Sequence, residues 1–294
     1  LRQRSDWDAN SKREMELPPT PEALPISVVD THCHLDIEDG DIYLTAAEAL
    51  ERASSVGVDR IVQVGVDVVS SRWGVELAEK TPNILATVAL HPNEAPRIFA
   101  DQDREALETA LAEIAEMAKH PKVRGIGETG LDFFRTEAEL LEVQEESFRR
   151  HIQIAKENHK ALIIHDRDAH DDVVRVLHSE GAPEKVVFHC FSGDESLARI
   201  ASENGWYCSF SGTVTFKNSN NLRAALALLP PELILVETDA PFLTPTPYRG
   251  RPNASYLIPL TARFMADVRG MELESLCHYL SDNAETVFGK FGDV

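Results

Sequence analysis

Short runs of apolar, often β-branched residues alternate along the chain with longer segments in which apolar residues recur every three or four positions. The first pattern predicts buried β-strands and the second predicts amphipathic helices. We predict strands at residues 28–32, 60–65, 84–90, 123–127, 161–165, 186–189, 206–211 and 233–237. We predict helices at residues 43–56, 69–80, 102–119, 137–159, 169–179, 194–204, 219–228, 254–269 and 272–288.

The helix predicted over residues 137–159 illustrates the second pattern. Leu141, Phe148, Ile152 and Ala155 recur at helical spacing, with charged residues between them. One face of this helix is therefore expected to be buried against the predicted strands.

Eight strand–helix units in succession favour an α/β fold in which parallel strands close into a (β/α)8 TIM barrel. A doubly wound open sheet is the main alternative, and it would usually place a glycine-rich phosphate loop after its first strand. Here that position holds His32 and His34. No linker interrupts residues 27–294, which we predict to form one barrel domain. Residues 1–26 are polar and proline-bearing, and we predict an extended, flexible N-terminal extension.

Composition and charge narrow the class of protein. The chain has 294 residues, of which 43% are hydrophobic and 27% charged, so it has enough apolar residues for a large core. Its formal net charge of -20 argues against a protein that coats nucleic acid with a basic face. The same charge is compatible with an enzyme whose bound cations supply positive charge locally.

The cysteines and the apolar runs indicate the compartment. The four cysteines are far apart and form no metal-knuckle spacing, so we expect reduced thiols in a cytoplasmic protein. Cys33 and Cys190 adjoin histidines, and strand alternation predicts that both are small buried apolar residues. No apolar run reaches the ~20 residues that a membrane span needs, so no membrane association is expected.

Polar side chains that bind metals occur where the predicted strands end. His32 and His34 share one face at the end of the first strand, because side chains alternate along a strand. The ends of later strands carry, in order, His91, Glu128, His165, His189 and Asp239. The carboxyl ends of barrel strands are where barrel enzymes have their active sites. We therefore expect these side chains to meet.

The remaining histidines fall on predicted helices or at helix ends. They are His120, His151, His159, His170, His178 and His278. We predict that these six are surface or capping residues with no role in the site.

Four imidazoles (His32, His34, His165, His189) and two carboxylates (Glu128, Asp239) are too many ligands for one tetrahedral zinc ion. They suit two divalent ions about 3.5–4 Å apart that share a bridging group. Glu128 is the natural bridge, because a carboxylate has two oxygens. Asp239 is the natural general base for the attacking water, although it could also cap a helix before Pro241.

These residues lie in motifs that resemble those of the TatD-related metal-dependent deoxyribonucleases, which are barrels of the amidohydrolase superfamily. The resemblance runs from about residue 27 to the C-terminus. The matching motifs are DTHCH at 30–34, LHP at 90–92, GETGLD at 127–132, IHDRDA at 164–169, FHCFSG at 188–193, ETDAP at 237–241, YRGRPN at 248–253 and NAETVF at 283–288.

The resemblance implies a TIM barrel of the metallo-dependent hydrolase type that cleaves phosphodiester bonds in DNA. It implies a 3′→5′ exodeoxyribonuclease in which two divalent ions, magnesium, manganese or zinc, activate a water. The implied metal ligands are His32, His34, Glu128, His165, His189 and Asp239. The most specific form of this prediction divides the ligands between the two metals. His32 and His34 hold one metal jointly with Glu128 and Asp239, and His165 and His189 hold the other.

Other residues receive roles around this centre. His91 is expected to contact the scissile phosphate or to protonate the leaving oxygen, and Glu237 to orient the water or support a ligand. The cations expected to hold backbone phosphates are Arg167, Lys217, Arg249 and Arg251. Phe191 and Tyr248 could stack on an unpaired base, although packing roles are also open. Asp132 is expected to shape its loop as a hydrogen-bond acceptor.

We therefore predict a hydrolase whose partner is DNA, single-stranded or at its 3′ ends, and leave the oligomeric state open. The main alternative is hydrolysis at carbon, either of a cyclic amide or of an ester such as an aminoacyl-tRNA. A metal-retaining scaffold that binds nucleic acid or protein without turnover is a third possibility. The intact set of ligands argues against this scaffold.

Overall fold

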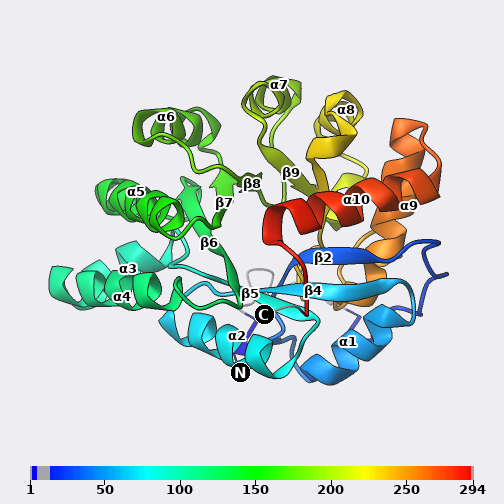
Figure 1. Ribbon diagram of the computed structural model, residues 1–294, viewed down its shortest axis with the longest axis horizontal. Helices are drawn as coiled ribbons and strands as arrows, with labels where there is room; N and C mark the ends of the chain where they lie inside the picture. The colour runs from blue at the N-terminus through cyan, green and yellow to red at the C-terminus, as the bar shows by residue number, and fades with distance from the viewer. Residues whose placement is uncertain (1, 5–13, 293–294) are drawn as a thin grey trace.

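The computed structural model describes residues 2–4 and 14–292, and within them an eight-stranded parallel sheet forms the centre of the molecule (Figure 1). The strands follow one another around the sheet in chain order. They are β2 (Val28–Cys33), β4 (Val58–Val64), β5 (Ile84–Val88), β6 (Val123–Asp132), β7 (Ala161–Arg167), β8 (Val186–Phe188), β9 (Tyr207–Phe210) and β10 (Ile234–Val236).

The two edges of this sheet meet, so it closes into a barrel. Cys33 at the end of β2 forms a parallel bridge with Ala240, four residues beyond the last residue of β10. The amide of Asp239 donates to the carbonyl of His32 at 2.9 Å, and the amide of His34 donates to the carbonyl of Ala240 at 2.8 Å. The closed barrel is confirmed, and the doubly wound alternative is wrong.

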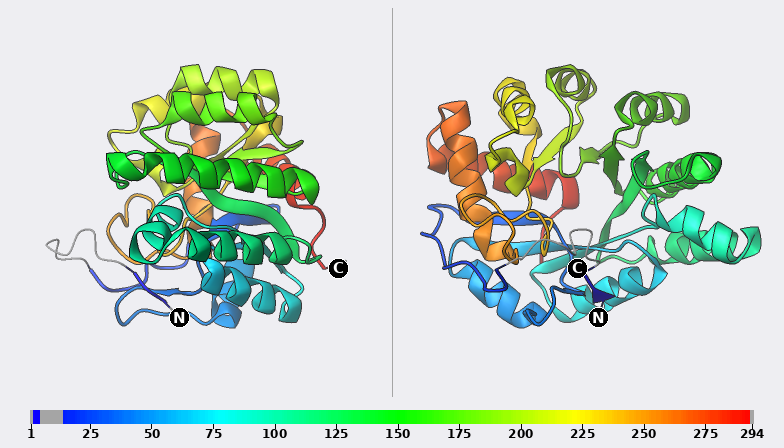
Figure 2. Two further views of the ribbon diagram at one scale, coloured as in Figure 1. Left: turned by 90° about the vertical axis from the view of Figure 1, so that its left-hand side faces the viewer. Right: turned by 180° about the vertical axis from the view of Figure 1, so that it is seen from behind.

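Helices surround the strands of the barrel, as Figures 1 and 2 show. They are α1 (Ala46–Ser54), α2 (Val68–Lys80), α3 (Glu94–Asp101), α4 (Arg104–Met117), α5 (Leu141–Glu157), α6 (His170–Glu180), α7 (Glu195–Asn204), α8 (Asn220–Leu228), α9 (Ile258–Arg269) and α10 (Leu273–Phe288). Short 3₁₀ turns are η1 (Ala138–Leu140), η2 (Gly212–Thr215), η3 (Pro231–Leu233) and η4 (Ser255–Leu257).

Two differences from the predicted elements affect the site. Helix α3 was not predicted; its Pro96 lies in the first turn, where the missing amide costs no helical hydrogen bond. Strand β6 continues to Asp132, five residues beyond its predicted end at residue 127. Glu128 therefore lies within a strand and does not follow one.

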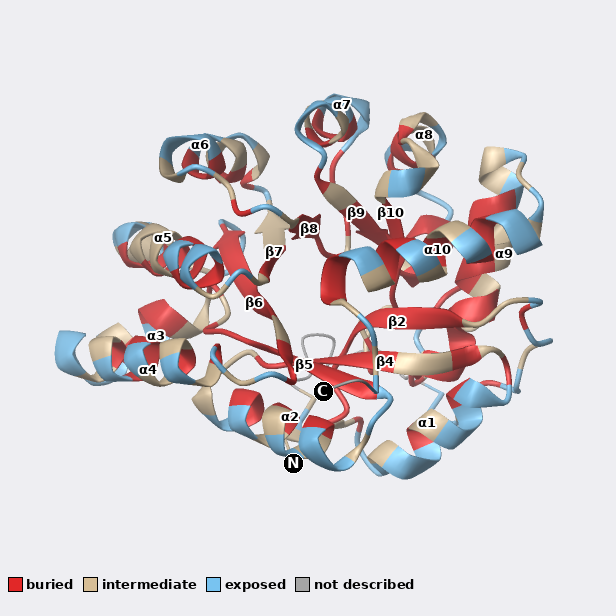
Figure 3. Cartoon of the chain, in the orientation of Figure 1, coloured by how far each residue is buried: buried red, intermediate tan, exposed pale blue. Residues whose placement is uncertain are grey.

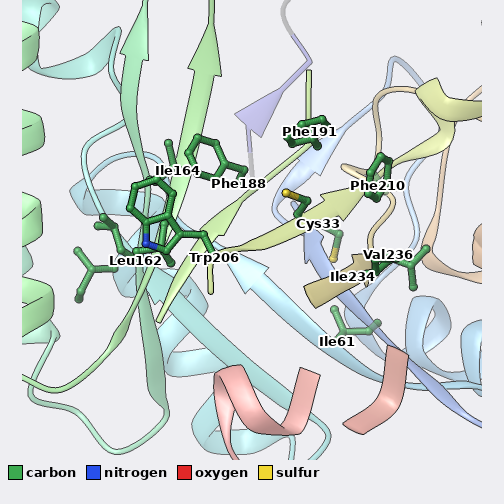
Figure 4. Close-up of a cluster of buried hydrophobic side chains, with 14 of the residues drawn as sticks. Cys33, Ile61, Leu162, Ile164, Phe188, Phe191, Trp206, Phe210, Ile234 and Val236 are labelled. Atoms are coloured by element: carbon green, nitrogen blue, oxygen red, sulfur yellow. The ribbon is translucent and has the colours of Figure 1, made fainter. Parts of the chain in front are cut away.

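The strands are buried on both faces, as expected for a parallel sheet covered by helices (Figure 3). Alternate residues fill two separate clusters. Ile163 and Val187 belong to the cluster inside the barrel, whereas Ile164 and Phe188 pack outward. Figure 4 shows part of the outer cluster, in which the ring centroid of Trp206 lies 5.9 Å from that of Phe188. His165 and His189 share strand parity with the inner residues.

The described part of the N-terminal extension lies against the barrel. Strand β1 (Arg2–Gln3) pairs in parallel with β3 (Ile37–Glu38), which was not predicted. Tyr256 donates from its hydroxyl to the carbonyl of Pro18, and the amide of Leu24 donates to the carbonyl of Val56 at 2.9 Å. The predicted flexibility of the extension falls partly on residues 5–13, which lie outside the described residues.

Within residues 2–4 and 14–292, no helix has both the length and the apolar character needed to cross a bilayer.

Candidate metal centre

The side chains predicted from the strand ends do meet, at one end of the barrel. They come from β2 and the residues after it (His32, His34), the residues after β5 (His91), β6 (Glu128), β7 (His165) and the residues after β8 and β10 (His189, Asp239). All are buried or mostly buried; the most exposed side chains among them, His91 and His165, are 18% exposed.

Glu128 lies at the middle of this group, and its two oxygens face different partners. Its Oε1 lies 2.6 Å from Nδ1 of His165, 3.1 Å from Nε2 of His189 and 3.4 Å from Nε2 of His91. This oxygen therefore faces the histidines that come from β5, β7 and β8.

The other oxygen of Glu128 faces the histidines of β2. Glu128 Oε2 lies 3.5 Å from Nε2 of His32 and 3.9 Å from Nε2 of His34. Asp239 Oδ1 lies 3.4 Å from Nε2 of His34 and 3.8 Å from Nε2 of His32. The carboxylate of Glu128 thus separates two groups of nitrogen donors, which is the arrangement expected of a bridging ligand.

These donors fit divalent cations. Sets of three donor atoms that lie within 4.8 Å of one another are formed by His32, His34 and Glu128; by His32, His189 and Asp239; and by His91, Glu128 and His165. In the described chain, both ring nitrogens of His32 are buried without a hydrogen-bond partner. A buried imidazole without partners is costly in a folded protein unless a ligand such as a metal uses it.

Three of the histidines have one ring nitrogen fixed by an acceptor. His34 donates from Nδ1 to the carbonyl of Val64 at 3.1 Å. His189 donates from Nδ1 to Oε1 of Glu237 at 2.9 Å. His165 lies between two carboxylates, with Nε2 3.2 Å from Oδ2 of Asp132 and Nδ1 2.6 Å from Oε1 of Glu128. Such partners fix the ring orientation and turn the other nitrogen toward a metal, as is usual for metal-binding histidines.

His91 has the opposite arrangement. The backbone amide of Asn93 donates to Nδ1 of His91 at 3.1 Å. An amide can only donate, so Nδ1 carries no proton, and in the neutral ring Nε2 must carry it. Burial lowers the pKa of His91, which favours that neutral ring. Nε2 of His91 therefore presents a hydrogen-bond donor to the centre and no lone pair for a metal.

The carboxylates and imidazoles of the centre shift one another's pKa values. Burial by itself would raise the pKa of Glu128, but the charge of His189 and the hydrogen bonds from His165 and His189 hold it well below its usual range. Burial likewise opposes a low pKa for Asp239, and the hydrogen bond with His34 outweighs it. The centre thus holds two ionised carboxylates, which favour positive charge between them.

The pKa values of the imidazoles shift in both directions. Burial lowers the pKa of His32, and the neighbouring charge of His189 lowers it further. Burial also disfavours the charged forms of His34 and His189, but nearby carboxylates outweigh it and raise both pKa values. The rings of His32 and His189 are stacked with centroids 3.7 Å apart, so charge on one disfavours charge on the other.

Glu237 lies behind this centre. Its side chain is fully buried, and Oε1 accepts hydrogen bonds from Nδ1 of His189 and from the amide of Cys190 at 2.8 Å. These contacts favour the supporting role predicted for Glu237 over contact with a water. Cys33 is fully buried among apolar residues, as predicted. Cys190 is only partly buried, and its thiol lies 3.3 Å from the hydroxyl of Ser211, so that prediction is wrong.

The predicted phosphate-binding cations differ in their surroundings. The Arg167 guanidinium lies 3.9 Å from the ring centroid of Phe134, and that of Arg249 lies 4.3 Å from the ring centroid of Phe216. Lys217 directly follows Phe216 and is exposed on the loop after η2. Arg251 binds Glu16 instead, at 3.0 Å, and so holds the N-terminal extension against the barrel.

Of the two aromatic residues considered for base stacking, Phe191 is not available for it. Phe191 is 2% exposed and packs against Phe210, with centroids 5.6 Å apart. Tyr248 lies under the guanidinium of Arg251. Asp132 does shape its loop, as predicted, because its Oδ1 accepts from the amides at positions 134 and 135.

A polar row on helix α5 was missed by the sequence reasoning. Gln144, Ser147 and His151 are all buried, although His151 was predicted to lie at the surface. Gln144 donates to the carbonyl of Pro92 at 3.0 Å and accepts from the amide of Asp132 at 2.9 Å. Positions 144, 147 and 151 recur at helical spacing, and this spacing could have predicted that the three polar side chains share one face of the helix.

Comparisons with known proteins identify the family. Residues 29–289 match the family described as TatD related DNase. The chain is 41% identical over 270 residues to an uncharacterized metal-dependent hydrolase, TatD, of Mycobacterium tuberculosis; the match covers 89% of this chain and 98% of that protein. It is 38% identical to the uncharacterized metal-dependent hydrolase YabD of Bacillus subtilis, covering 88% and 98%.

Solved structures share the fold. The crystal structure of YjjV, a TatD homologue from Escherichia coli, superposes with a TM-score of 0.80 at 26% identity, covering 90% of this chain and 98% of that one. An organophosphorus hydrolase from Deinococcus radiodurans superposes with a TM-score of 0.55 at 16% identity, covering 92% and 95%, and shows the common barrel fold alone.

Proposed function

Since the chain belongs to the TatD-related DNase family of metal-dependent hydrolases, we propose that it hydrolyses phosphodiester bonds in DNA, as a 3′→5′ exonuclease. The observation that carries the proposal is the carboxylate of Glu128 between two groups of imidazoles, with a donor nitrogen of His91 beside it. A phosphodiester needs its charge neutralised, an attacking water aimed in line, and its leaving oxygen stabilised.

The residues suggest how two cations would be held. His32, His34 and Asp239 would hold one ion together with Oε2 of Glu128, and His165 and His189 would hold the other with Oε1. When bound, two divalent ions neutralise the phosphate, lower the pKa of a water and stabilise the leaving oxygen.

The chain's own groups would complete the reaction. Asp239 keeps a low pKa and has a side chain 15% exposed, so its carboxylate can accept a proton from the attacking water. His91 donates from Nε2 and can hold a phosphate oxygen or protonate the leaving oxygen. Glu237 accepts from Nδ1 of His189 and would fix the orientation of that ring.

The test compares substrates across metals. The enzyme is treated with a chelator and then given magnesium, manganese or zinc, with end-labelled single-stranded DNA, RNA, dihydrouracil and an aminoacyl ester as substrates. We expect DNA cleavage to disappear in chelator and to return with metal, releasing mononucleotides from the 3′ end. Faster turnover of the amide or the ester would favour hydrolysis at carbon, and DNA cleavage that persists in chelator would reject the metal requirement.

Asp239→Asn tests the general base. We expect kcat on DNA to fall by about 10²–10⁴-fold, because the amide cannot accept the proton. The matched control is Asp171→Asn, which makes the same change on the exposed surface of α6 and should retain activity. Circular dichroism checks that both variants are folded. Activity of Asp239→Asn equal to that of the control would reject the role.

A further inference from the structure

Two exposed phenylalanines lie at the barrel end that holds the metal centre. The large apolar side chains exposed in the described ranges are Met15, Val69, Phe133 and Phe134. Phe134 is 61% exposed and Phe133 is 36% exposed. They directly follow Asp132, the last residue of β6, which lies beside β7 in Figure 1. An exposed pair of aromatic rings next to a catalytic centre indicates a binding role more than a packing role.

The backbone of this aromatic pair is tied to the metal centre. Asp132 accepts the amide of Phe134 on Oδ1 at 3.0 Å, while its Oδ2 accepts from Nε2 of His165 at 3.2 Å. The amide of Phe133 donates to the carbonyl of Arg167 at 3.0 Å. One carboxylate therefore positions both a predicted metal ligand and the start of the aromatic pair.

Positive charge accompanies the ring of Phe134. The guanidinium of Arg167 lies 3.9 Å from its ring centroid, and Arg167 is two residues beyond His165 on the same strand. Arg135 belongs to the same turn, where its amide donates to Oδ1 of Asp132 at 2.9 Å, and Phe133 in that turn donates to the carbonyl of Arg167. Burial lowers the pKa of Arg135, and the charge of Arg167 lowers it further. In a chain with a net charge of -20, such a local pair of cations suits a phosphate.

We propose that Phe134, backed by Arg167, is the platform on which an unpaired nucleobase of the substrate stacks. Arg135 and Arg167 would hold the backbone phosphate next to that base. The proposal rests on the proposed cleavage of DNA and adds that the site selects a strand whose base is unpaired. In a duplex each base is covered by its neighbours, whereas an unpaired base offers an open face to an aromatic ring.

The test measures stacking directly, with metal-free enzyme so that no turnover occurs. A single-stranded oligonucleotide carries 2-aminopurine near its 3′ end, because the fluorescence of this base is quenched when it stacks. We expect quenching by the wild type and by Phe134→Trp, and its loss in Phe134→Leu, which keeps an apolar side chain without a π face. The matched control is Phe291→Leu; Phe291 also lies under an arginine, Arg60, which lies at the start of β4.

Affinity gives a second readout. We expect Phe134→Leu to raise the Kd for the intact strand by about 10-fold or more, the size of effect usual for stacking of one base. An oligonucleotide that lacks the base at the labelled position should bind wild type and Phe134→Leu with the same Kd. Phe134→Trp should restore the wild-type Kd for the intact strand.

Two results would overturn the platform. One is an equal Kd for wild type and Phe134→Leu on the intact strand. The other is an equal loss of affinity on the intact and the base-free strands, because the ring would then not recognise the base. Failure of the proposed function can be told apart from failure of the platform. In that case the wild type would bind the strand and quench its 2-aminopurine fluorescence, but it would release no nucleotides when metal is added.

Discussion

The roles of His34, His189 and His91 depend on the hydrogen-bond partner of Nδ1 in each ring. His34 and His189 each donate from Nδ1 to an oxygen, which leaves Nε2 as an acceptor for a cation. His91 accepts an amide on Nδ1, which leaves Nε2 as a donor. We therefore expect His91 to contact the substrate and not a metal, although one of its ring nitrogens lies within 4.8 Å of possible metal-ligating atoms of Glu128 and His165.

His91→Gln tests this assignment. We expect kcat on DNA to fall by about 10²-fold or more, because the leaving alkoxide loses its proton donor. The loss should be smaller on a p-nitrophenyl phosphodiester, whose leaving group needs no proton. Metal content measured by elemental analysis should equal that of the wild type, whereas His34→Gln should lose metal. Loss of metal from His91→Gln would make His91 a ligand.

At the scale of elements, helix α5 holds the loops that carry the polar groups. Gln144 bonds the backbone of Pro92, next to His91, and the backbone of Asp132, which fixes His165. His151 lies on the same face of α5, and its Nε2 accepts from the amide of Leu90 at 3.0 Å. One buried polar row therefore sets the positions of two loops at the mouth of the barrel.

Gln144→Leu tests this role of α5. The change leaves the buried amide of Asp132 and the carbonyl of Pro92 without this partner, and we expect a loss of about 1–3 kcal/mol in the free energy of unfolding. We also expect kcat/KM on DNA to fall, because both loops can shift. Urea unfolding and steady-state kinetics measure the two effects. Gln153→Leu makes the same change on the exposed face of α5 and should alter neither.

At the scale of the whole molecule, burial of His151 links stability to pH. Burial lowers its pKa to about 4, and the charge of Arg150 adds to this, while the hydrogen bond to the carbonyl of Ser147 opposes it. The unfolded chain binds this proton near pH 6.5. The folded state therefore loses stability as pH falls from about 6.5 toward 4, and keeps it in full above that range.

His151→Gln tests the pH dependence. Glutamine can accept the amide of Leu90 but does not titrate. We expect the free energy of unfolding of the wild type, relative to this variant, to fall by about 2 kcal/mol between pH 7 and pH 5. Urea unfolding at each pH measures the difference, and His278→Gln on the exposed surface of α10 is the control. A pH-independent difference would mean that His151 titrates normally in the folded protein.

Local patterns along the chain were enough to predict the barrel and the side chains that meet at one of its ends. Strand and helix periods are local properties, so all eight strands could be placed from apolar runs. The carboxyl ends of parallel strands meet at one barrel end, so residues as far apart as His32 and Asp239 could be expected to meet. Neither step requires knowledge of how individual side chains pack.

The direction in which those side chains point depends instead on how the strands pack together. Val29 packs inside the barrel and Cys33 packs outside it, so the alternation inverts at a register shift in β2, which turns the histidines inward. A second register shift, between Ile126 and Thr129, lies at Glu128. Gly130, with a φ of 142°, lets β6 approach β7 where a Cβ would lie 2.0 Å from the carbonyl of His165.

The same distinction applies to the aromatic and polar residues. Whether Phe191 or Phe134 was exposed, and whether His151 lay inside or outside, depended on neighbours from other strands and helices. Residue type and spacing are read along one chain, whereas burial depends on segments that are distant in sequence. The sequence therefore identified the chemistry of the centre, and packing determined its geometry and the surface beside it.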